Sequence, residues 1–278
     1  MVGKFLQLYG VTQDPETKEY IIVMQYANNG NLLSYLNQNI NKLTWMDKLR
    51  HLSDIAKYLY TIHHAGSVHC DLHGGNIVLN EGAALICDLG LSRSVNSRKS
   101  DSTIRGVLPF IAPEVFHTCK FTQKSDVYSF GIIMYLMATG EPPFRDKQFS
   151  RDLVCDILDG LRPLMPDSAP EEYKKLAERC CDTDPDKRPD AYPLYYDIYN
   201  LFEVVKMDNS DDNVWNTIYH NDVKPLSRLE KESKYSSTLL PTRDLPKPRN
   251  NHASRQLPPL SEFSLLSLGV ELGKVDEK

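Results

Sequence analysis

An apolar stretch near the middle of the chain constrains the fold more than any other feature. Residues 127–138 are apolar throughout except for Ser129 and Gly131. A helix that is apolar on every side must be covered on every side, and this stretch is shorter than the about 20 residues that span a bilayer. Gly140 and the prolines after it would end the helix. We therefore expect a central helix inside a soluble domain, with other helices packed around it.

Several other stretches have the apolar spacing of amphipathic helices. They are residues 31–36, 45–64, 151–160, 171–181 and 190–205. Before the second of them, Thr44 and Asp47 have the spacing of a capping box. The buried face of this helix is predicted to consist of Trp45, Leu49, Leu52, Ile55, Leu59 and Ile62.

Strand patterns occur in two places, both in the first third of the chain. Residues 5–11 and 19–26 are rich in apolar residues and flank a segment in which Asp14, followed by proline, favours a turn. Residues 76–86 would form a tight hairpin that turns at Gly82. The sequence therefore predicts a few short strands and a predominantly helical remainder.

Composition and charge exclude several classes of function. The formal net charge is −5, whereas a protein whose main partner is nucleic acid needs an excess of Lys and Arg. The six cysteines include no CxxC pair and no metal-ligand spacing, which is typical of a reduced, intracellular protein. The start of the chain lacks the apolar core of a secretory signal. We therefore expect a cytoplasmic protein with no nucleic-acid partner and no membrane partner.

Three polar residues have the order and spacing that phosphoryl transfer requires. That reaction needs a carboxylate that orients the attacking hydroxyl, together with oxygen ligands for Mg²⁺. In residues 68–79, "VHCDLHGGNIVL", Asp71 is followed five positions later by Asn76. Asp88 comes directly after the predicted hairpin, where the end of a strand can direct its side chain at the same loop. This set is typical of a kinase catalytic centre.

Further motifs follow in the order of one known family. They are "DLG" (88–90), "APE" (112–114), "DVYSFG" (126–131) and "DKRP" (186–189). On these motifs, residues 4–206 resemble a eukaryotic-type protein kinase domain of the tyrosine-kinase-like group. Each motif is weak by itself, but their order and spacing are specific. The resemblance implies ATP-dependent phosphorylation of protein Ser or Thr, with ATP and Mg²⁺ as cofactors and a protein as substrate.

The resemblance also implies a fold and its division along the chain. It implies an α+β, protein-kinase-like fold with a mostly helical C-lobe and a partial N-lobe of two to three strands. We expect the N-lobe remnant and the hinge in residues 1–27, and the C-lobe in residues 28–206. In residues 207–278 the apolar periodicity is lost and proline and serine are frequent, so this tail is expected to be disordered.

The resemblance assigns catalytic roles to four residues. Asp71 would be the catalytic base. His73 stands where serine/threonine kinases place a lysine that contacts the transferred phosphate. Asn76 would act in catalysis as a metal ligand, and Asp88 would hold the metal with it.

Three apolar residues would surround the adenine ring. Met24 would be the gatekeeper, the backbone of Ala27 would meet adenine at the hinge, and Val78 would form the floor of the pocket. For Met24 and Val78, an ordinary place in a strand core is an equally good interpretation.

Structural parts of the family match as well. The residues that match its regulatory spine and the anchor of that spine are Leu8, His69, Leu89 and Asp126. Glu114 and Arg188 match a buried ion pair. His63 and His64 end a predicted helix, where capping or an interaction with the helix dipole is favoured over catalysis. Cys87 precedes Asp88, and inert packing is favoured over a role in the ATP pocket.

Some positions depart from the family pattern. Cys70 replaces the arginine that pairs with an activation-loop phosphate, and a thiol cannot make that pair. Val107 replaces a threonine near Asp71. The hydroxyl residues within 92–103 have two equally good interpretations, a solvated loop or a phosphoregulatory segment. The second would make an upstream kinase a partner.

The family's Gly-rich loop, strand lysine and helix glutamate have no counterpart before Leu8. Losing one such preorganised group typically costs about 10²–10³ in rate. We therefore expect this chain to bind Mg-ATP weakly and to phosphorylate poorly or not at all, and we expect Leu8, Leu89 and the inner face of residues 20–26 to be partly uncovered. A shortened gene model or natural fragment is favoured over a pseudokinase scaffold as the explanation.

Two other functions are compatible with the motifs. The chain could be a catalytically silent pseudokinase module that presents its helical lobe to another protein, in which case its partner is a scaffold or signalling protein. A small-molecule phosphotransferase with the same fold is a weaker third interpretation, because the "APE" and "GEPPF" segments are typical of kinases with protein substrates.

Overall fold

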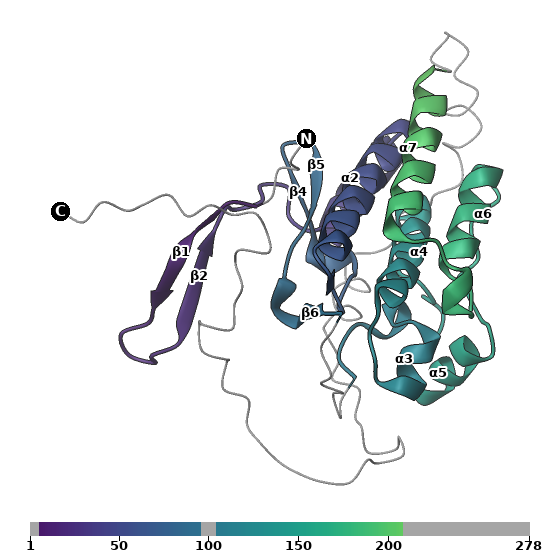
Figure 1. Ribbon diagram of the computed structural model, residues 1–278. Coiled ribbons are helices and arrows are strands. Elements are labelled where there is room, and N and C mark those ends of the chain that lie inside the picture. The colour runs from purple at the N-terminus through teal and green to yellow at the C-terminus, as the bar shows by residue number, and fades with distance from the viewer. Residues whose placement is uncertain (1–5, 96–103, 208–278) are drawn as a thin grey trace. The chain divides into compact units, whose positions relative to one another are not determined.

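The computed structural model describes residues 6–95 and 104–207, which all belong to one unit of the chain, Met1–Leu240 (Figure 1). Within these residues the fold is α+β, as expected, and most of the regular structure is helical. The predicted disordered tail lies outside the described residues from position 208 onward, as do positions 96–103 of the predicted phosphoregulatory segment.

Every helix and strand pattern recognised in the sequence corresponds to an element. The helices are α1 (Leu32–Asn39), α2 (Trp45–His64), α3 (Pro113–Thr118), α4 (Gln123–Thr139), α5 (Arg151–Leu158), α6 (Glu171–Cys180) and α7 (Ala191–Met207). The strands are β1 (Leu8–Gln13), β2 (Tyr20–Met24), β3 (Ser67–Val68), β4 (Ile77–Asn80), β5 (Ala83–Ile86) and β6 (Arg93–Ser94). A short 3₁₀ turn, Gly74–Asn76, lies between β3 and β4.

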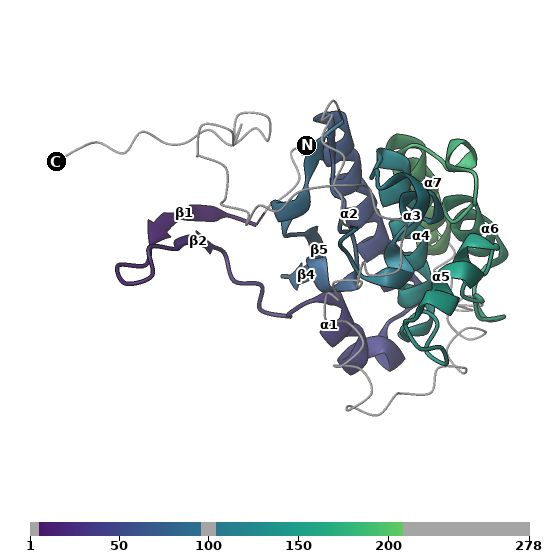
Figure 2. The same ribbon diagram turned by 90° about the horizontal axis from the view of Figure 1, so that it is seen from below.

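The apolar stretch forms α4, the central helix. Thirteen of its 17 residues are buried, so no side of this helix faces solvent. Thr122 and Ser125 form a capping box at its start, and Gly140, with a φ of 68°, ends it in the left-handed conformation that glycine adopts at little cost. The helix packs against α2 and α6 (Figure 2).

α2 and α7 lie side by side (Figure 1), and α2 also packs against α4. The predicted capping box of α2 is present, since the Asp47 N–H donates to Thr44 Oγ1 at 3.2 Å and the Thr44 N–H donates to Asp47 Oδ2 at 3.1 Å. All six residues predicted for its apolar face are buried. Each large apolar side chain removed from water in this way stabilises the fold by about 1.5–3 kcal/mol.

The described strands form three separate antiparallel pairs, β1–β2, β3–β6 and β4–β5. The β4–β5 hairpin turns at Glu81 and Gly82, whose φ values of 48° and 77° match a tight two-residue turn. In the β1–β2 hairpin, the Asp14 side chain accepts the backbone N–H groups of Glu16 and Thr17, which fixes the predicted turn.

The apolar side chains of β2 are exposed within the described residues. Tyr20, Ile21, Ile22, Val23 and Met24 are each 43% to 60% exposed. Leu89 is 38% exposed. The expected uncovering of these groups is confirmed, and the interpretation of Met24 as a strand-core residue is wrong for this reason.

A lysine that the sequence analysis did not single out is buried where α2 begins. Lys48 is 4% exposed, and its Nζ donates to the carbonyl oxygen of Ala138 at 3.1 Å. That carbonyl belongs to the last turn of α4, where carbonyls have no partner within the helix. The ammonium group also lies 5.0 Å from the centre of the Trp45 ring. Burial lowers the pKa of Lys48 to about 8.

We predict that Gly131→Ala destabilises the protein. A Cβ at this position would lie 2.5 Å from Cys181 Sγ and 2.9 Å from Cys180 Cβ, at the contact of α4 with α6. We expect a loss of about 1–3 kcal/mol in the free energy of unfolding by urea, although alanine is the better helix former. Gly10→Ala is the control, because no heavy atom lies within 4 Å of its Cβ position. No loss in Gly131→Ala would contradict the close packing of the two helices.

We predict that Lys48 makes stability depend on pH above 8. Its pKa is about 8 in the folded chain against 10.5 for an ordinary lysine, so the unfolded chain binds more protons between these values. The free energy of unfolding should therefore rise by about 1–3 kcal/mol from pH 8 to 10 in the wild type relative to Lys48→Met. If the free energy of unfolding changes with pH in the same way in the two proteins, burial of the Lys48 charge does not destabilise the folded chain.

Candidate active site

The loop of residues 69–76, called the catalytic loop below after the role expected for Asp71 and Asn76, is attached to the central helix α4 through Asp126. Its carboxylate is buried in α4 and accepts three hydrogen bonds: from the His69 N–H at 2.7 Å, from the Cys70 N–H at 3.0 Å, and from His63 Nε2 at 2.9 Å. Cys70 has a φ of 70°, which is strained for a residue other than glycine. These bonds hold the loop in a shape that the chain would not adopt by itself.

His69 connects the loop to the residues before Asp88. Its Nδ1 accepts the Asp71 N–H at 3.3 Å, so the ring proton is on Nε2, which donates to the Cys87 carbonyl at 3.2 Å. Burial lowers the pKa of His69, which keeps the ring neutral and this donor–acceptor pattern fixed. The predicted spine residue His69 is fully buried.

Asp71 and Asn76 are in direct contact. The Asn76 amide nitrogen donates to the Asp71 carbonyl at 2.9 Å and to the Asp71 carboxylate oxygen Oδ2 at 3.2 Å. The Asn76 carbonyl accepts the Cys87 N–H at 2.9 Å, which ties the loop to the end of β5. The loop therefore brings Asp71 and Asn76 together and is hydrogen-bonded to Cys87, the residue before the "DLG" motif.

His73 faces the same carboxylate from the other side. Its Nδ1 accepts the Gly75 N–H at 3.0 Å, so the neutral ring carries its proton on Nε2, which lies 3.7 Å from Asp71 Oδ1. Gly75 is needed here because a Cβ at its position would lie 2.7 Å from the His73 ring. A Cβ at Gly106 would lie 3.4 Å from Asp71 Oδ1, so the segment before "APE" also approaches Asp71.

Asp88 lies in the left-handed conformation with a φ of 58°, directly after β5 and Cys87. Its Oδ1 accepts the Gly90 N–H at 3.2 Å, and the residue is exposed. Burial, followed by the Asp88 charge, raises the pKa of the Cys87 thiol to about 11. A thiol with so high a pKa is a poor nucleophile at neutral pH, which supports the prediction that Cys87 is inert.

The segment directly after the predicted hinge residue Ala27 is hydrogen-bonded to β4. The Asn29 N–H donates to the Leu79 carbonyl at 3.2 Å, and the Leu79 N–H donates to the Gly30 carbonyl at 2.9 Å. Ala27 accepts the Gly30 N–H at 3.2 Å. Val78 pairs with Leu85 across the β4–β5 hairpin and is half-buried. Met24 is the last residue of β2, and its side chain is exposed within the described residues.

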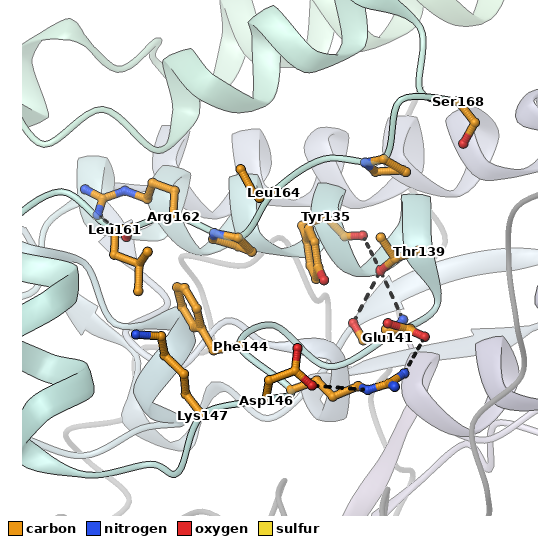
Figure 3. A pocket seen from close by; sticks show the side chains of 13 residues that line it. Tyr135, Thr139, Glu141, Phe144, Asp146, Lys147, Leu161, Arg162, Leu164 and Ser168 are labelled. Atoms are coloured by element: carbon orange, nitrogen blue, oxygen red, sulfur yellow. Dashed lines mark hydrogen bonds and ion pairs between the residues drawn. The ribbon is translucent and has the colours of Figure 1, made fainter.

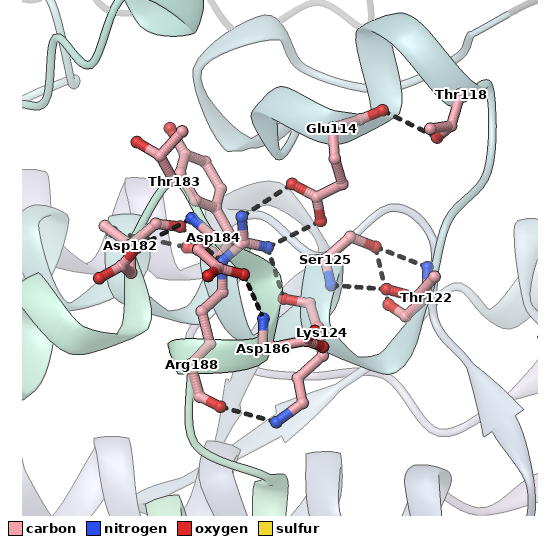
Figure 4. A network of polar contacts seen from close by, with 12 residues as sticks. Glu114, Thr118, Thr122, Lys124, Ser125, Asp182, Thr183, Asp184, Asp186 and Arg188 are labelled. Atoms are coloured by element: carbon pink, nitrogen blue, oxygen red, sulfur yellow. Dashed lines mark hydrogen bonds and ion pairs between the residues drawn. The ribbon is translucent and has the colours of Figure 1, made fainter.

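The predicted ion pair between Glu114 and Arg188 is present (Figure 4). The two terminal nitrogens of Arg188 donate to the two carboxylate oxygens of Glu114 at 2.8 and 2.7 Å. Arg188 also donates to the carbonyls of Asp182 and Lys124, and its guanidinium lies 5.2 Å from the Tyr128 ring centre. The pair ties α3 of the "APE" motif to the segment before α7, and the bond from Arg188 to the Lys124 carbonyl connects both to the start of α4.

A cavity of about 630 Å³ lies at the other end of α4, away from these residues (Figure 3). Tyr135 and Thr139 of α4 line it, together with Phe144 and the segment around Leu164. None of the predicted site residues lines this cavity. Two of the charged residues that line it, Glu141 and Arg145, are paired with each other at 2.7 Å.

The sequence analysis missed the role of His63. Capping was favoured for this residue, but its ring is buried and contacts Asp126, and the backbone carbonyl at the helix end is satisfied by Gln123 Nε2 at 2.7 Å. A signal was present in the helical pattern, because His63 follows Leu59 by four positions and so lies on the apolar face. A polar residue there requires a buried partner.

The chain belongs to the protein tyrosine and serine/threonine kinase family. A sequence profile of that family matches residues 3–198, which include all the elements of the site described above.

Relatives of the chain are larger proteins. A putative serine/threonine-protein kinase/receptor of Acanthamoeba polyphaga mimivirus is 34% identical over 171 residues, which is 60% of this chain and 10% of the relative. A probable serine/threonine-protein kinase of Dictyostelium discoideum is 30% identical over 220 residues, 69% of this chain and 13% of the relative. A probable LIM domain-containing serine/threonine-protein kinase of the same organism is 29% identical and covers 66% of this chain and 28% of the relative. The chain spans less than a third of each.

Among the described residues, no helix combines the length and the apolar character needed to cross a bilayer.

We predict that Glu114→Ala strongly destabilises the protein. The Arg188 side chain has no exposed surface, so the variant would leave a buried charge without its carboxylate. We expect a loss of about 3–5 kcal/mol in the free energy of unfolding. Glu203→Ala, which breaks the exposed pair with Lys206, is the control and should cost about 0.5 kcal/mol or less. Equal losses in the two variants would show that burial of the pair is unimportant.

Proposed function

We propose that this chain is the catalytic part of a protein kinase that transfers the γ-phosphoryl group of ATP to Ser or Thr side chains of proteins. The family match supports this class of reaction, and the names of the relatives support Ser/Thr as the acceptor. The contact of Asn76 with Asp71 carries the proposal, because it orients a carboxylate in the loop that the family uses for catalysis.

Asp71 is suited to act as the base. Its Oδ2 is held by Asn76 and its Oδ1 faces His73, so the carboxylate is fixed by two neighbours of the same loop. A substrate hydroxyl would donate its hydrogen bond to this carboxylate and lose its proton there as the oxygen attacks phosphorus. His73, with its proton on Nε2, would supply a hydrogen-bond donor where the family commonly has a lysine.

Asn76 and Asp88 fit a magnesium ion. The Asn76 amide nitrogen is occupied by Asp71, so its oxygen is the atom that a cation would meet. Asp88 uses Oδ1 for Gly90 and is exposed, so its carboxylate is accessible. Oxygen donors are those that Mg²⁺ prefers, and Mg²⁺ is commonly bound by one or two side chains together with phosphates. The bound ion would neutralise charge on the phosphates.

Adenine would lie against the hinge. Ala27, Met24 and Val78 are the residues proposed to contact it, and the hydrogen bonds of Asn29 and Gly30 with Leu79 support a fixed distance between the hinge and β4. The proposed partners are a protein substrate and an upstream kinase or scaffold, and the proposed location is the cytoplasm. We retain residues 1–27, 28–206 and 207–278 as the proposed division of the chain.

A catalytically silent interaction module is the second candidate. The exposed apolar side chains of β2 favour it, because such surfaces commonly mark contacts with other proteins.

We predict that Asp71→Asn removes phosphoryl transfer. The purified 278-residue protein would be incubated with radiolabelled Mg-ATP and a generic protein substrate, and phosphoserine and phosphothreonine would be measured. Because Asn cannot accept the proton, we expect transfer to fall by about 10²-fold or more. The absolute rate should lie below the about 1–100 s⁻¹ that is usual for kinases.

Asp197→Asn is the control for this measurement, because Asp197 lies on the surface of α7 in a pair with Arg179. It should leave transfer unchanged. If the wild-type protein is folded by circular dichroism and binds Mg-ATP but transfers no more phosphate than Asp71→Asn, the kinase proposal is wrong and the interaction module is favoured.

A further inference from the structure

The outward side of α7 is apolar and has no cover within the described residues. The buried residues among the 17 of this helix are Ala191, Leu194, Ile198 and Val205. We propose that the outward side is an interface at which two copies of the chain associate, with their α7 helices antiparallel. The inference concerns a surface outside the proposed active site and does not depend on the kinase function proposed above.

A stripe of large side chains, called the tyrosine face below, follows the outward side of α7. Its members lie three or four positions apart, so they are stacked along one side of the helix. They are Tyr192, Tyr196, Tyr199, Glu203 and Met207. The three tyrosines are 53%, 53% and 40% exposed, and Met207 is 82% exposed. A helix with apolar groups on every side is normally covered on every side, and an exposed aromatic stripe is typical of a contact with another protein.

The rings of the tyrosine face are ordered by contacts within the chain. The ring centre of Tyr192 lies 6.1 Å from that of Tyr196. It also lies 5.3 Å from that of Tyr60 on α2, which runs alongside α7 (Figure 1). The Tyr199 hydroxyl is hydrogen-bonded to the Glu203 carboxylate. Tyrosine has only two side-chain torsions to fix on binding, so these contacts leave a surface that is largely preorganised for a partner.

The charges of the tyrosine face favour an antiparallel pair of helices. Two parallel helices would place Glu203 against Glu203 and Lys206 against Lys206, and like charges in an interface are costly. In a two-fold antiparallel pair, Tyr199 lies near the axis, and Tyr196 meets Glu203 of the second copy. The tyrosine hydroxyl can donate to that carboxylate. Tyr192 then meets Lys206 of the second copy, and an ammonium group is attracted to an aromatic ring.

The size of the tyrosine face predicts a weak, reversible dimer. A half-exposed aromatic side chain can bury about 100 Å² more in a contact. With Met207 included, two copies would remove on the order of 1,000 Å² from water, which is the lower limit for a specific interface. We therefore expect a dissociation constant on the order of 10–100 µM.

The test is sedimentation equilibrium of the full chain at concentrations from about 1 µM to 1 mM. We expect reversible dimerisation of the wild type. In Tyr196→Glu the dissociation constant should rise about 10-fold or more, because the new carboxylate meets Glu203 of the second copy. Adding Glu203→Lys to this variant should restore most of the dimerisation. The two positions lie about 10 Å apart along one helix, so this rescue can act only between copies.

Ile22→Glu is the matched control, because Ile22 belongs to the other exposed apolar surface, that of β2, and is 60% exposed. It should leave dimerisation unchanged. Circular dichroism would check that each variant is folded, which we expect because the substituted side chains lie on the surface.

Four results would overturn the inference. The first is a wild type that stays monomeric at about 1 mM; faster amide exchange of residues 191–207 in Tyr196→Glu would then show that another part of the same chain covers the tyrosine face. The second is dimerisation that is lost in Ile22→Glu but kept in Tyr196→Glu, which would place the interface on β2. The third is assemblies larger than a dimer, which a closed two-fold contact does not form. The fourth is failure of Glu203→Lys to rescue Tyr196→Glu, which would rule out the antiparallel pair.

Discussion

The geometry around Asp71 depends on one buried carboxylate, that of Asp126. A charge removed from water is costly unless donors replace the lost hydration, and three donors do so here. Each hydrogen bond to a charged group is worth about 1.5–3 kcal/mol, enough to offset the strain at Cys70. The central helix therefore fixes the shape of the catalytic loop and, with it, the position of the proposed base, Asp71.

The central helix can impose this shape because both of its ends are tied. At its start, Arg188 donates to the Lys124 carbonyl and to Glu114, which connects the helix to the "APE" segment. At its end, Lys48 donates to the Ala138 carbonyl. Between these points α4 is apolar and covered, so it behaves as a rigid frame. Asp88 is exposed, and the residue before it is joined to the loop by the hydrogen bond from the Cys87 N–H to the Asn76 carbonyl.

The features that could be predicted from the sequence are those that depend on residues close together in the chain. The apolar run of α4 and the Thr44 capping box each depend on residues close together in the chain, and both are present. The contact of Asp71 with Asn76 also spans only five positions. The contacts of His63 with Asp126 and of Lys48 with Ala138 join residues 63 and 90 positions apart, and no local pattern specifies such pairs.

We propose that Asp71, Asn76 and Asp88 form one site for Mg-ATP. Its most direct test is a crystal structure of the protein with Mg²⁺ and a non-hydrolysable ATP analogue. We predict a cation at about 2.0–2.1 Å from an Asn76 oxygen and from the Asp88 carboxylate, with the terminal phosphate toward Asp71. A nucleotide bound elsewhere, or a cation that contacts neither residue, would contradict the account.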